Sequence, residues 1–313
     1  MTSDKQSKDS TKCYYGWVMV FVTGLQRFYS GPGQTYSIQN WKPDYIEEFS
    51  LTESQMGTLY AAATTASGCL LFTMGMAVDK WGTRNMTLWA ALPGLTLACF
   101  VSSQMTNYWM VWFSIFLLRF FGQGAMSMIP SVCVAHWFTK KRGRAFSLSG
   151  IGGFVSALVL PPMNTVLIET FGWRETWQIW VCLIIGIMFP VALCFYRSKP
   201  VDMGLEGEPD EQDENEDGSY ARAAPVEVSW TMNEVIRTPA FWVLIFVGTE
   251  MAAVITALTF YIRDIGAVSG ITELQSASLL SISAMIGFPV TVTTGFMLEK
   301  FQANVILALS FFF

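Results

Sequence analysis

The chain has 313 residues, of which 52% are hydrophobic, 15% aromatic and only 14% charged. A domain that contacts water on all sides carries more charge than this, so the composition excludes an ordinary soluble protein and favours a membrane protein. The formal net charge of −5 comes from one acidic stretch between Asp202 and Asp217. Because no basic patch with interleaved aromatic residues is present, we predict no nucleic-acid partner.

The cysteines and the single histidine exclude the common metal and redox sites. The six cysteines are scattered without a CxxC pair, and His136 is the one histidine in the sequence. Zinc, haem and dithiol sites need clustered ligands. We therefore predict no metal and no cofactor.

Apolar stretches of roughly 20 residues recur along the chain, each long enough to cross a hydrocarbon core of about 30 Å. The predicted membrane spans are 15–36, 56–78, 86–104, 108–135, 145–168, 176–196, 239–262 and 276–298, and a ninth begins at Ala303. The sequence therefore predicts an all-α membrane protein with about nine transmembrane helices, whose first partner is the lipid bilayer.

Lysine and arginine residues set the expected orientation. They occur in the N-terminal tail, 1–14, and then in alternate loops, at Lys80, Arg84, Lys140 to Arg144, Arg197, Lys199, Arg222 and Lys300. Cytoplasmic loops carry such an excess of positive residues. We therefore predict an integral multi-pass protein with a cytoplasmic N-terminus.

An acidic linker, 198–238, separates two helical regions, 15–197 and 239–313. The linker is too charged and too poor in large apolar residues to fold alone, so we expect a solvated spacer, with regulation or partner binding as the alternative. The ending Gly75-x-x-x-Asp79-Lys80 of the second span recurs as Gly295-x-x-x-Glu299-Lys300 at the end of the eighth. This repeat is typical of a duplicated transporter.

The loop after the second span reads Gly75-Met-Ala-Val-Asp79-Lys80-Trp-Gly82-Thr-Arg84-Asn85. It resembles the G-x-x-x-D-[RK]-x-G-x-[RK]-[RK] motif of the major facilitator superfamily, and departs from it at Asn85. We expect Gly75 to permit close helix contact, Asp79 to face the N-terminus of a neighbouring helix, and Gly82 to allow a tight turn. We call these residues the gate motif.

Further segments resemble the monocarboxylate and oxalate/formate-type porters of that superfamily. They are Arg119-Phe-Phe-Gly122-Gln123-Gly124, Trp137-Phe138 before Lys140-Lys-Arg142-Gly143-Arg144-Ala145, and Gly172-Trp173-Arg174. The resemblance implies two six-helix halves that rock about a central site, with each side of the membrane reached in turn. We expect such a bundle truncated to about nine helices, as a fragment or a naturally short relative.

Arg27 lies in the middle of the first span, where a charge is costly and normally faces protein or a water-filled cavity. Thr23, Arg27, Ser30, Gln34 and Ser37 share one helical face. This face is a candidate substrate site for a carboxylate, with a structural arginine as the alternative. The Gly31-Pro32-Gly33 sequence within the span predicts either a broken helix that turns carbonyl groups toward a ligand or a simple kink.

Arg119, Gln123 and Ser127 repeat at four-residue intervals in the fourth span, which predicts a second polar face. The resemblance links the matching arginine to substrate or proton coupling, while a structural hydrogen-bonding role is the alternative. The candidate substrate-binding residues are Arg27, Ser30, Gln34, Arg119 and Gln123. If both arginines face one cavity, they require an anion or an acid between them.

Glu250 is the one carboxylate deep within a span of the second half, which makes it the candidate proton-coupling group, with a static ion pair as the alternative. Together these features predict a secondary active transporter of a small solute, with an organic anion such as a monocarboxylate as the candidate substrate. A proton or an exchanged anion would drive it. The alternative is a non-transporting sensor or scaffold on a truncated transporter fold. An enzyme is least favoured, because no nucleophile motif or histidine-acid cluster occurs.

Overall fold

The computed structural model describes residues 14–139, 141–205 and 232–300, and within these ranges all regular structure is helical. Predictions for the tail 1–13, for linker residues 206–231 and for the span beginning at Ala303 lie outside the described residues. The predicted all-α fold is confirmed for the part that is described.

The first predicted span is not one continuous helix. It is divided into α1 (Gly16–Tyr29), η1 (Gly31–Gly33), α2 (Thr35–Ile38), η2 (Gln39–Trp41) and α3 (Lys42–Glu48). Pro32 lacks a backbone donor, and the chain around it is tightened into a 3-10 turn in which the Gly33 amide donates to the Ser30 carbonyl at 3.0 Å. Of the two outcomes predicted for Gly31-Pro32-Gly33, a broken helix or a simple kink, the structure shows the broken helix.

The second and third spans are joined at Gly82. They comprise α4 (Glu53–Met86), the π-helical η3 (Thr87–Ala91) and α5 (Leu92–Ser103). Gly82 interrupts α4 with φ 80° and ψ 158°, a conformation that favours glycine. The predicted tight turn at Gly82 is thus confirmed.

The remaining spans of the first half also follow the predicted order. The fourth comprises α6 (Tyr108–Leu117), the π-helical η4 (Leu118–Ala125) and α7 (Met126–Trp137). The fifth is α8 (Arg142–Phe171), and the sixth comprises α9 (Trp173–Leu183), the π-helical η5 (Ile184–Met188) and α10 (Phe189–Phe195).

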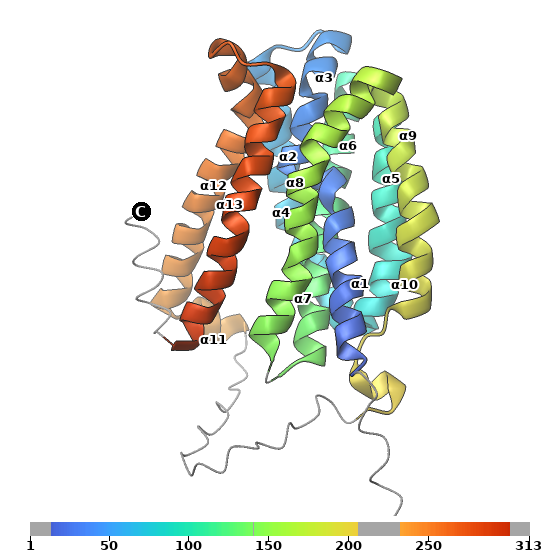
Figure 1. Ribbon diagram of the computed structural model, residues 1–313, viewed down its shortest axis with the longest axis vertical. Helices are drawn as coiled ribbons and strands as arrows, with labels where there is room; N and C mark the ends of the chain where they lie inside the picture. Colours follow the sequence, from blue (N-terminus) through green and yellow to red (C-terminus); the bar gives the residue numbers. More distant parts are fainter. Residues whose placement is uncertain (1–13, 140, 206–231, 301–313) are drawn as a thin grey trace, which may run out of the picture.

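The second half contributes two long helices to the described structure. After η6 (Pro200–Met203) and the short α11 (Met232–Ile236) come α12 (Pro239–Val268) and α13 (Glu273–Lys300). Figure 1 shows α12 and α13 side by side at one edge of the bundle, with α11 at the same end as α10. We call this end, where the linker attaches, the linker end, and the opposite end, where α3 lies, the far end.

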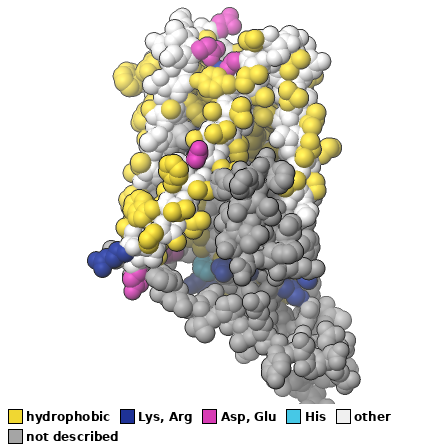
Figure 2. All heavy atoms as spheres, turned by 90° about the vertical axis from the view of Figure 1, so that its left-hand side faces the viewer, with side chains coloured by type: hydrophobic (Ala, Val, Ile, Leu, Met, Phe, Trp, Pro, Cys, Tyr) yellow, Lys and Arg dark blue, Asp and Glu magenta, His cyan; other side chains and the backbone are white. Residues whose placement is uncertain are grey.

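Five stretches of the described structure are long and apolar enough to cross a membrane: Glu53–Ser103, Tyr108–Trp137, Arg142–Phe171, Trp173–Phe195 and Pro239–Val268. The first has 51 residues. At 1.5 Å per residue it would be about 75 Å long, more than twice a hydrocarbon core, so it accounts for two spans. Figure 2 shows mostly hydrophobic side chains on the described part of the α12–α13 face, as contact with lipid requires.

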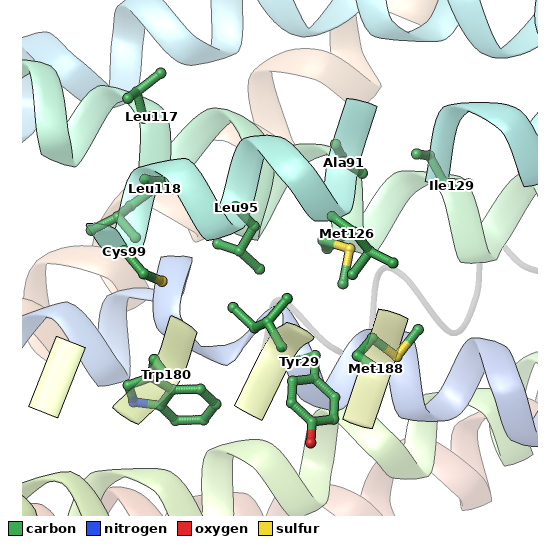
Figure 3. Packing of buried hydrophobic residues seen from close by; sticks show 14 of the residues in the cluster. Tyr29, Ala91, Leu95, Cys99, Leu117, Leu118, Met126, Ile129, Trp180 and Met188 are labelled. Atoms are coloured by element: carbon green, nitrogen blue, oxygen red, sulfur yellow. The ribbon is translucent and has the colours of Figure 1, made fainter. Parts of the chain in front are cut away.

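The apolar core lies inside the first half. Figure 3 shows Tyr29 of α1 near Leu95, Met126, Trp180 and Met188, which come from the third, fourth and sixth spans. These side chains are buried. Because lipid gives helices no hydrophobic reason to associate, this close packing is the main force that holds the spans together.

Helices α1 and α8 pack closely at Gly24 and Gly152. A Cβ atom on Gly152 would lie 1.8 Å from the Gly24 carbonyl oxygen, whereas one on Gly150 or Gly153 would meet no described atom within 4 Å. Of the three glycines in this part of the fifth span, Gly152 is therefore the one that the observed packing requires.

We predict that Gly152→Ala destabilises the protein by about 1–3 kcal/mol, because the new methyl group forces the two backbones apart. Gly150→Ala and Gly153→Ala are matched controls and should be neutral or slightly stabilising, since alanine favours helix. Thermal unfolding in detergent measures the difference. Equal effects at all three positions would contradict the prediction.

Candidate functional site

The polar face of the first span points into the first half, toward α7 and α8. The partly buried Arg27 donates from Nη2 to Ser131 Oγ at 2.8 Å and from Nε to Ser149 Oγ at 3.3 Å. Both serines have another acceptor, because Ser131 Oγ donates to the Ser127 carbonyl and Ser149 Oγ donates to Thr23 Oγ1. If the arginine moves away, each serine hydroxyl group therefore still donates its own hydrogen bond.

Ser30 and Gln34 continue this face toward the far end. Gln34 Nε2 donates to Ser30 Oγ at 3.0 Å and to Ser127 Oγ at 3.3 Å. Ser37 accepts from Asn164 Nδ2 of α8 at 2.8 Å. Although the helix is broken, four of its five predicted polar residues bond to neighbouring spans, and the fifth, Ser30, is buried and bonds within the first span.

Arg119 occupies a different environment. It is buried, and its Nη1 donates to the Gly33 carbonyl and to Thr35 Oγ1, both at 3.2 Å. Its guanidinium carbon lies 5.3 Å from the centre of the Tyr60 ring. Arg119 thus binds the broken part of the first span.

This contact depends on Gly33 and Gly122. A Cβ atom on Gly33 would lie 2.2 Å from the Leu118 carbonyl oxygen and 2.7 Å from the Gly122 Cα atom. Two glycines let η1 and η4 approach backbone to backbone, which brings the Gly33 carbonyl within reach of Arg119. The carbonyl that the sequence offered as a ligand group is therefore bonded to protein.

The two arginines do not converge on one point. No described residue bonds to both, and neither forms an ion pair with a carboxylate in the described part of the chain. The π-helical turn η4 changes the spacing that an α-helix would give to Arg119, Gln123 and Ser127. Ser127 lies against Gln34, while Gln123 Oε1 is buried and has no hydrogen-bond partner among the described residues.

Glu250 lies near the middle of α12 and is exposed. It forms no ion pair with another described residue. The structure therefore does not place it against Arg27 or Arg119.

The gate motif joins the second span to the sixth at the linker end. The amide of Arg84 donates to Ser198 Oγ at 3.0 Å, and its Nη2 donates to the Leu193 carbonyl at 3.1 Å. Asp79, Lys80 and Gly82 line a cavity of about 410 Å³ with His136 and Lys199. Gly75 has no close neighbour among the described atoms, so the expected close helix contact is not observed there.

The repeated motif falls in the last turns of α13. Gly295, Glu299 and Lys300 belong to that helix, but their side chains lie outside the described part of the structure. Their predicted role in a second gate stays a prediction.

Sequence reasoning missed the groups that surround the arginines. Thr35 and Tyr60 are common residue types in apolar helices, and no spacing rule marks them. A helical projection of the fourth span would have found Ser131 as the next step after Ser127.

The model of the Major Facilitator Superfamily matches residues 16–313. The chain belongs to the major facilitator superfamily. This confirms the resemblance seen in the gate motif.

The curated relatives of this superfamily member are distant. Monocarboxylate transporter 12 of Rattus norvegicus is 23% identical over 93% of the chain and 57% of the relative. The uncharacterized MFS-type transporter YhjX of Escherichia coli is 22% identical over 73% of the chain and 52% of its own length. Riboflavin transporter RibJ of Trypanosoma brucei brucei is 24% identical over 47% of the chain and 27% of its length. The chain spans little more than half of even the best covered of these relatives.

Two solved structures share the fold. A bacterial homologue of the human lysosomal transporter Spinster, in an inward-facing and unoccupied conformation, has a TM-score of 0.64 at 15% identity and covers 94% of this chain and 64% of its own. The D-xylose-proton symporter has a TM-score of 0.57 at 16% identity, with coverage of 92% and 70%. At such identities the likeness shows the fold alone.

The hydrogen bonds predict different effects of removing the two arginines. Arg119→Met leaves the Gly33 carbonyl without its donor and should cost about 1.5–3 kcal/mol of stability. Arg27→Met should cost less, since its serine partners keep other acceptors. Thermal unfolding of both variants in detergent tests this order, and a larger loss for Arg27→Met would contradict it.

Proposed function

We propose that this protein is a secondary active transporter that moves a small organic anion, with a monocarboxylate as the leading candidate, by alternating access. The linker lies on the cytoplasmic side in this proposal. Membership of the superfamily and the transporter names of the curated relatives support transport. The anion is our inference from the site.

Arg27 carries the inference. It places a positive charge within a membrane span, and it is held there by two hydroxyl groups without a neutralising carboxylate from the described residues. Leaving a charge uncompensated at this depth is costly. A carboxylate that accepts hydrogen bonds from the guanidinium fork would supply the missing charge and geometry.

The relatives allow more than one solute class. Monocarboxylate transporters of three vertebrates align with the chain, and so do a riboflavin transporter and a glycerol-3-phosphate transporter. We favour a monocarboxylate because the rat relative aligns over 93% of the chain and because one guanidinium fork suits one carboxylate.

Uptake into proteoliposomes tests the proposal, with a panel of radiolabelled monocarboxylates, dicarboxylates, sugars and amines. Arg27→Ala should reduce anion uptake about tenfold to a hundredfold at low solute concentration, the loss expected when a charge-assisted hydrogen bond worth about 1.5–3 kcal/mol disappears. Arg27→Lys should retain part of the activity, since it keeps the charge but not the fork.

Arg237→Ala makes the same chemical change at an exposed position beside α11 and is the matched control. Its uptake should equal that of the parent protein. Selective uptake of a neutral solute that survives Arg27→Ala would end the anion proposal.

We further propose Glu250 as the proton-coupling group. An ionisable residue in the middle of a span costs free energy, and such residues commonly mark proton or solute pathways. Glu250 is such a residue, and it has no ion-pair partner in the described residues. A carboxylate that faces a water-filled cavity can take up a proton on one side of the membrane and release it on the other.

Glu250→Gln mimics the protonated form and should abolish the acceleration of uptake by an inward proton gradient, while exchange of internal for external anion continues. Glu169→Gln, at an exposed acid near the end of α8, is the control and should leave the gradient effect intact. Parallel measurements with and without a pH gradient decide it. If an inward proton gradient still accelerates uptake in Glu250→Gln, a group other than Glu250 couples transport to the proton.

A further inference from the structure

Tyr60 of α4 touches the arginine region of the first half from two directions. Its hydroxyl group lies 2.8 Å from Thr35 Oγ1, the same atom that accepts a hydrogen bond from Arg119. Its ring lies beside the Arg119 guanidinium, at 5.3 Å. Arg119, Thr35 and Tyr60 therefore form a closed set of contacts within the first half.

Tyr60 also touches the second half. Its ring stacks on that of Phe260 in α12, with centroids 4.2 Å apart and planes 28° apart. Both side chains are buried, with 5% and 3% of their surface exposed. An aromatic pair of this geometry is favourable beyond the area it buries. Tyr60 therefore contacts both Arg119 and α12.

The contact between α12 and the first half is confined to the far end. Phe260 and Arg263 are buried, whereas Trp242, Phe246 and Val254 nearer the linker end are between 55% and 70% exposed. Arg263 Nη1 donates to the Asn40 carbonyl at 2.8 Å. The described part of α12 therefore closes on the first half at one end only.

Ionic contacts surround the aromatic pair at this end. Lys42 Nζ lies 2.6 Å from Glu53 Oε2 and forms a second ion pair with Asp264 of α12. The same ammonium group lies 5.3 Å from the centre of the Phe260 ring and 4.5 Å from that of Tyr261. A cation thus lies near each ring of the stacked pair, Arg119 near Tyr60 and Lys42 near Phe260.

We propose that Tyr60 is the positioning residue that couples the arginine site to closure of the far end by α12. The inference rests on the proposed transport by alternating access. An anion bound at Arg27 acts on the first span, which Arg119 holds through the Gly33 carbonyl and Thr35. A shift of that span changes the contacts that Arg119 and Thr35 make with Tyr60. The ring then loses the contacts that hold it against Phe260, and the far end is released.

Distances between spin labels test the coupling without any solute. The labels are attached to cysteines at Ser54→Cys and Val268→Cys, two exposed positions at the far ends of α4 and α12, in a protein whose other cysteines are replaced by serine. Pulsed electron resonance then reports the separation of the two halves. The closed arrangement should give the short distance.

Tyr60→Leu and Phe260→Leu should each raise the ratio of long to short distances about twofold to tenfold, the effect expected from loss of an aromatic stack. Tyr60→Phe keeps the ring and should stay closer to the parent. Phe72→Leu changes an exposed aromatic residue on the same helix and is the matched control. Phe260→Leu approaches the stack from the other half, so it decides the outcome should Tyr60→Leu fail to fold.

The link to the site is tested by a double-mutant cycle with Arg119→Lys, which keeps the charge but loses the planar fork. As a single change, Arg119→Lys should raise the ratio of long to short distances. In the Tyr60→Leu background it should raise that ratio little further. Additive effects, or an unchanged distance in Tyr60→Leu and Phe260→Leu, would overturn the proposal. Because no solute is present, such a result is independent of the uptake panel that tests the anion.

Discussion

The close approach of two backbones at Gly33 and Gly122 determines how the rest of the first half is arranged. Any side chain on Gly33 would collide with the Leu118 carbonyl oxygen, so the broken first span and the π-helical turn of the fourth fit together only with glycine at this position. The contact places the Gly33 carbonyl next to Arg119. A buried guanidinium then satisfies backbone that the helix break had left without an intrahelical partner, which is how a break is tolerated at membrane depth.

The two arginines consequently serve different purposes. Arg119 bonds to a main-chain carbonyl and lies beside an aromatic ring, in surroundings that hold it in one place. Arg27 bonds to serine hydroxyl groups that have their own acceptors, and so it can exchange them for another acceptor at little cost. A transporter needs both kinds of charge: one that keeps the site in shape, and one that binds and releases a solute on every cycle.

Helix α12 contacts the first half unevenly, and this unevenness lets the different roles of the two arginines affect the conformation of the protein. Its far end is bound through an ion pair, a main-chain hydrogen bond and stacked rings, while the part nearer the linker is exposed. Each contact in such a cluster is modest, since partly exposed ion pairs contribute about 1 kcal/mol or less. A cluster of modest contacts can open and close reversibly. Helix α13 packs against α8, where Ser281 Oγ donates to the Leu158 carbonyl at 2.6 Å.

The sequence by itself determined the helical membrane fold, the superfamily and the turn at Gly82, because long apolar runs and a glycine motif are local properties of the chain. It also placed Arg27, Ser30 and Gln34 on an inward face, because the cost of a charge in lipid leaves few alternatives. The tertiary structure decided that the first span is broken, that Arg119 and Gln123 leave the expected ladder at a π-helical turn, and that Gly152 rather than Gly150 makes the close contact. It alone brought Tyr60 against Phe260, some two hundred residues away. Such pairings depend on where distant backbones meet, which periodicity along one helix does not encode.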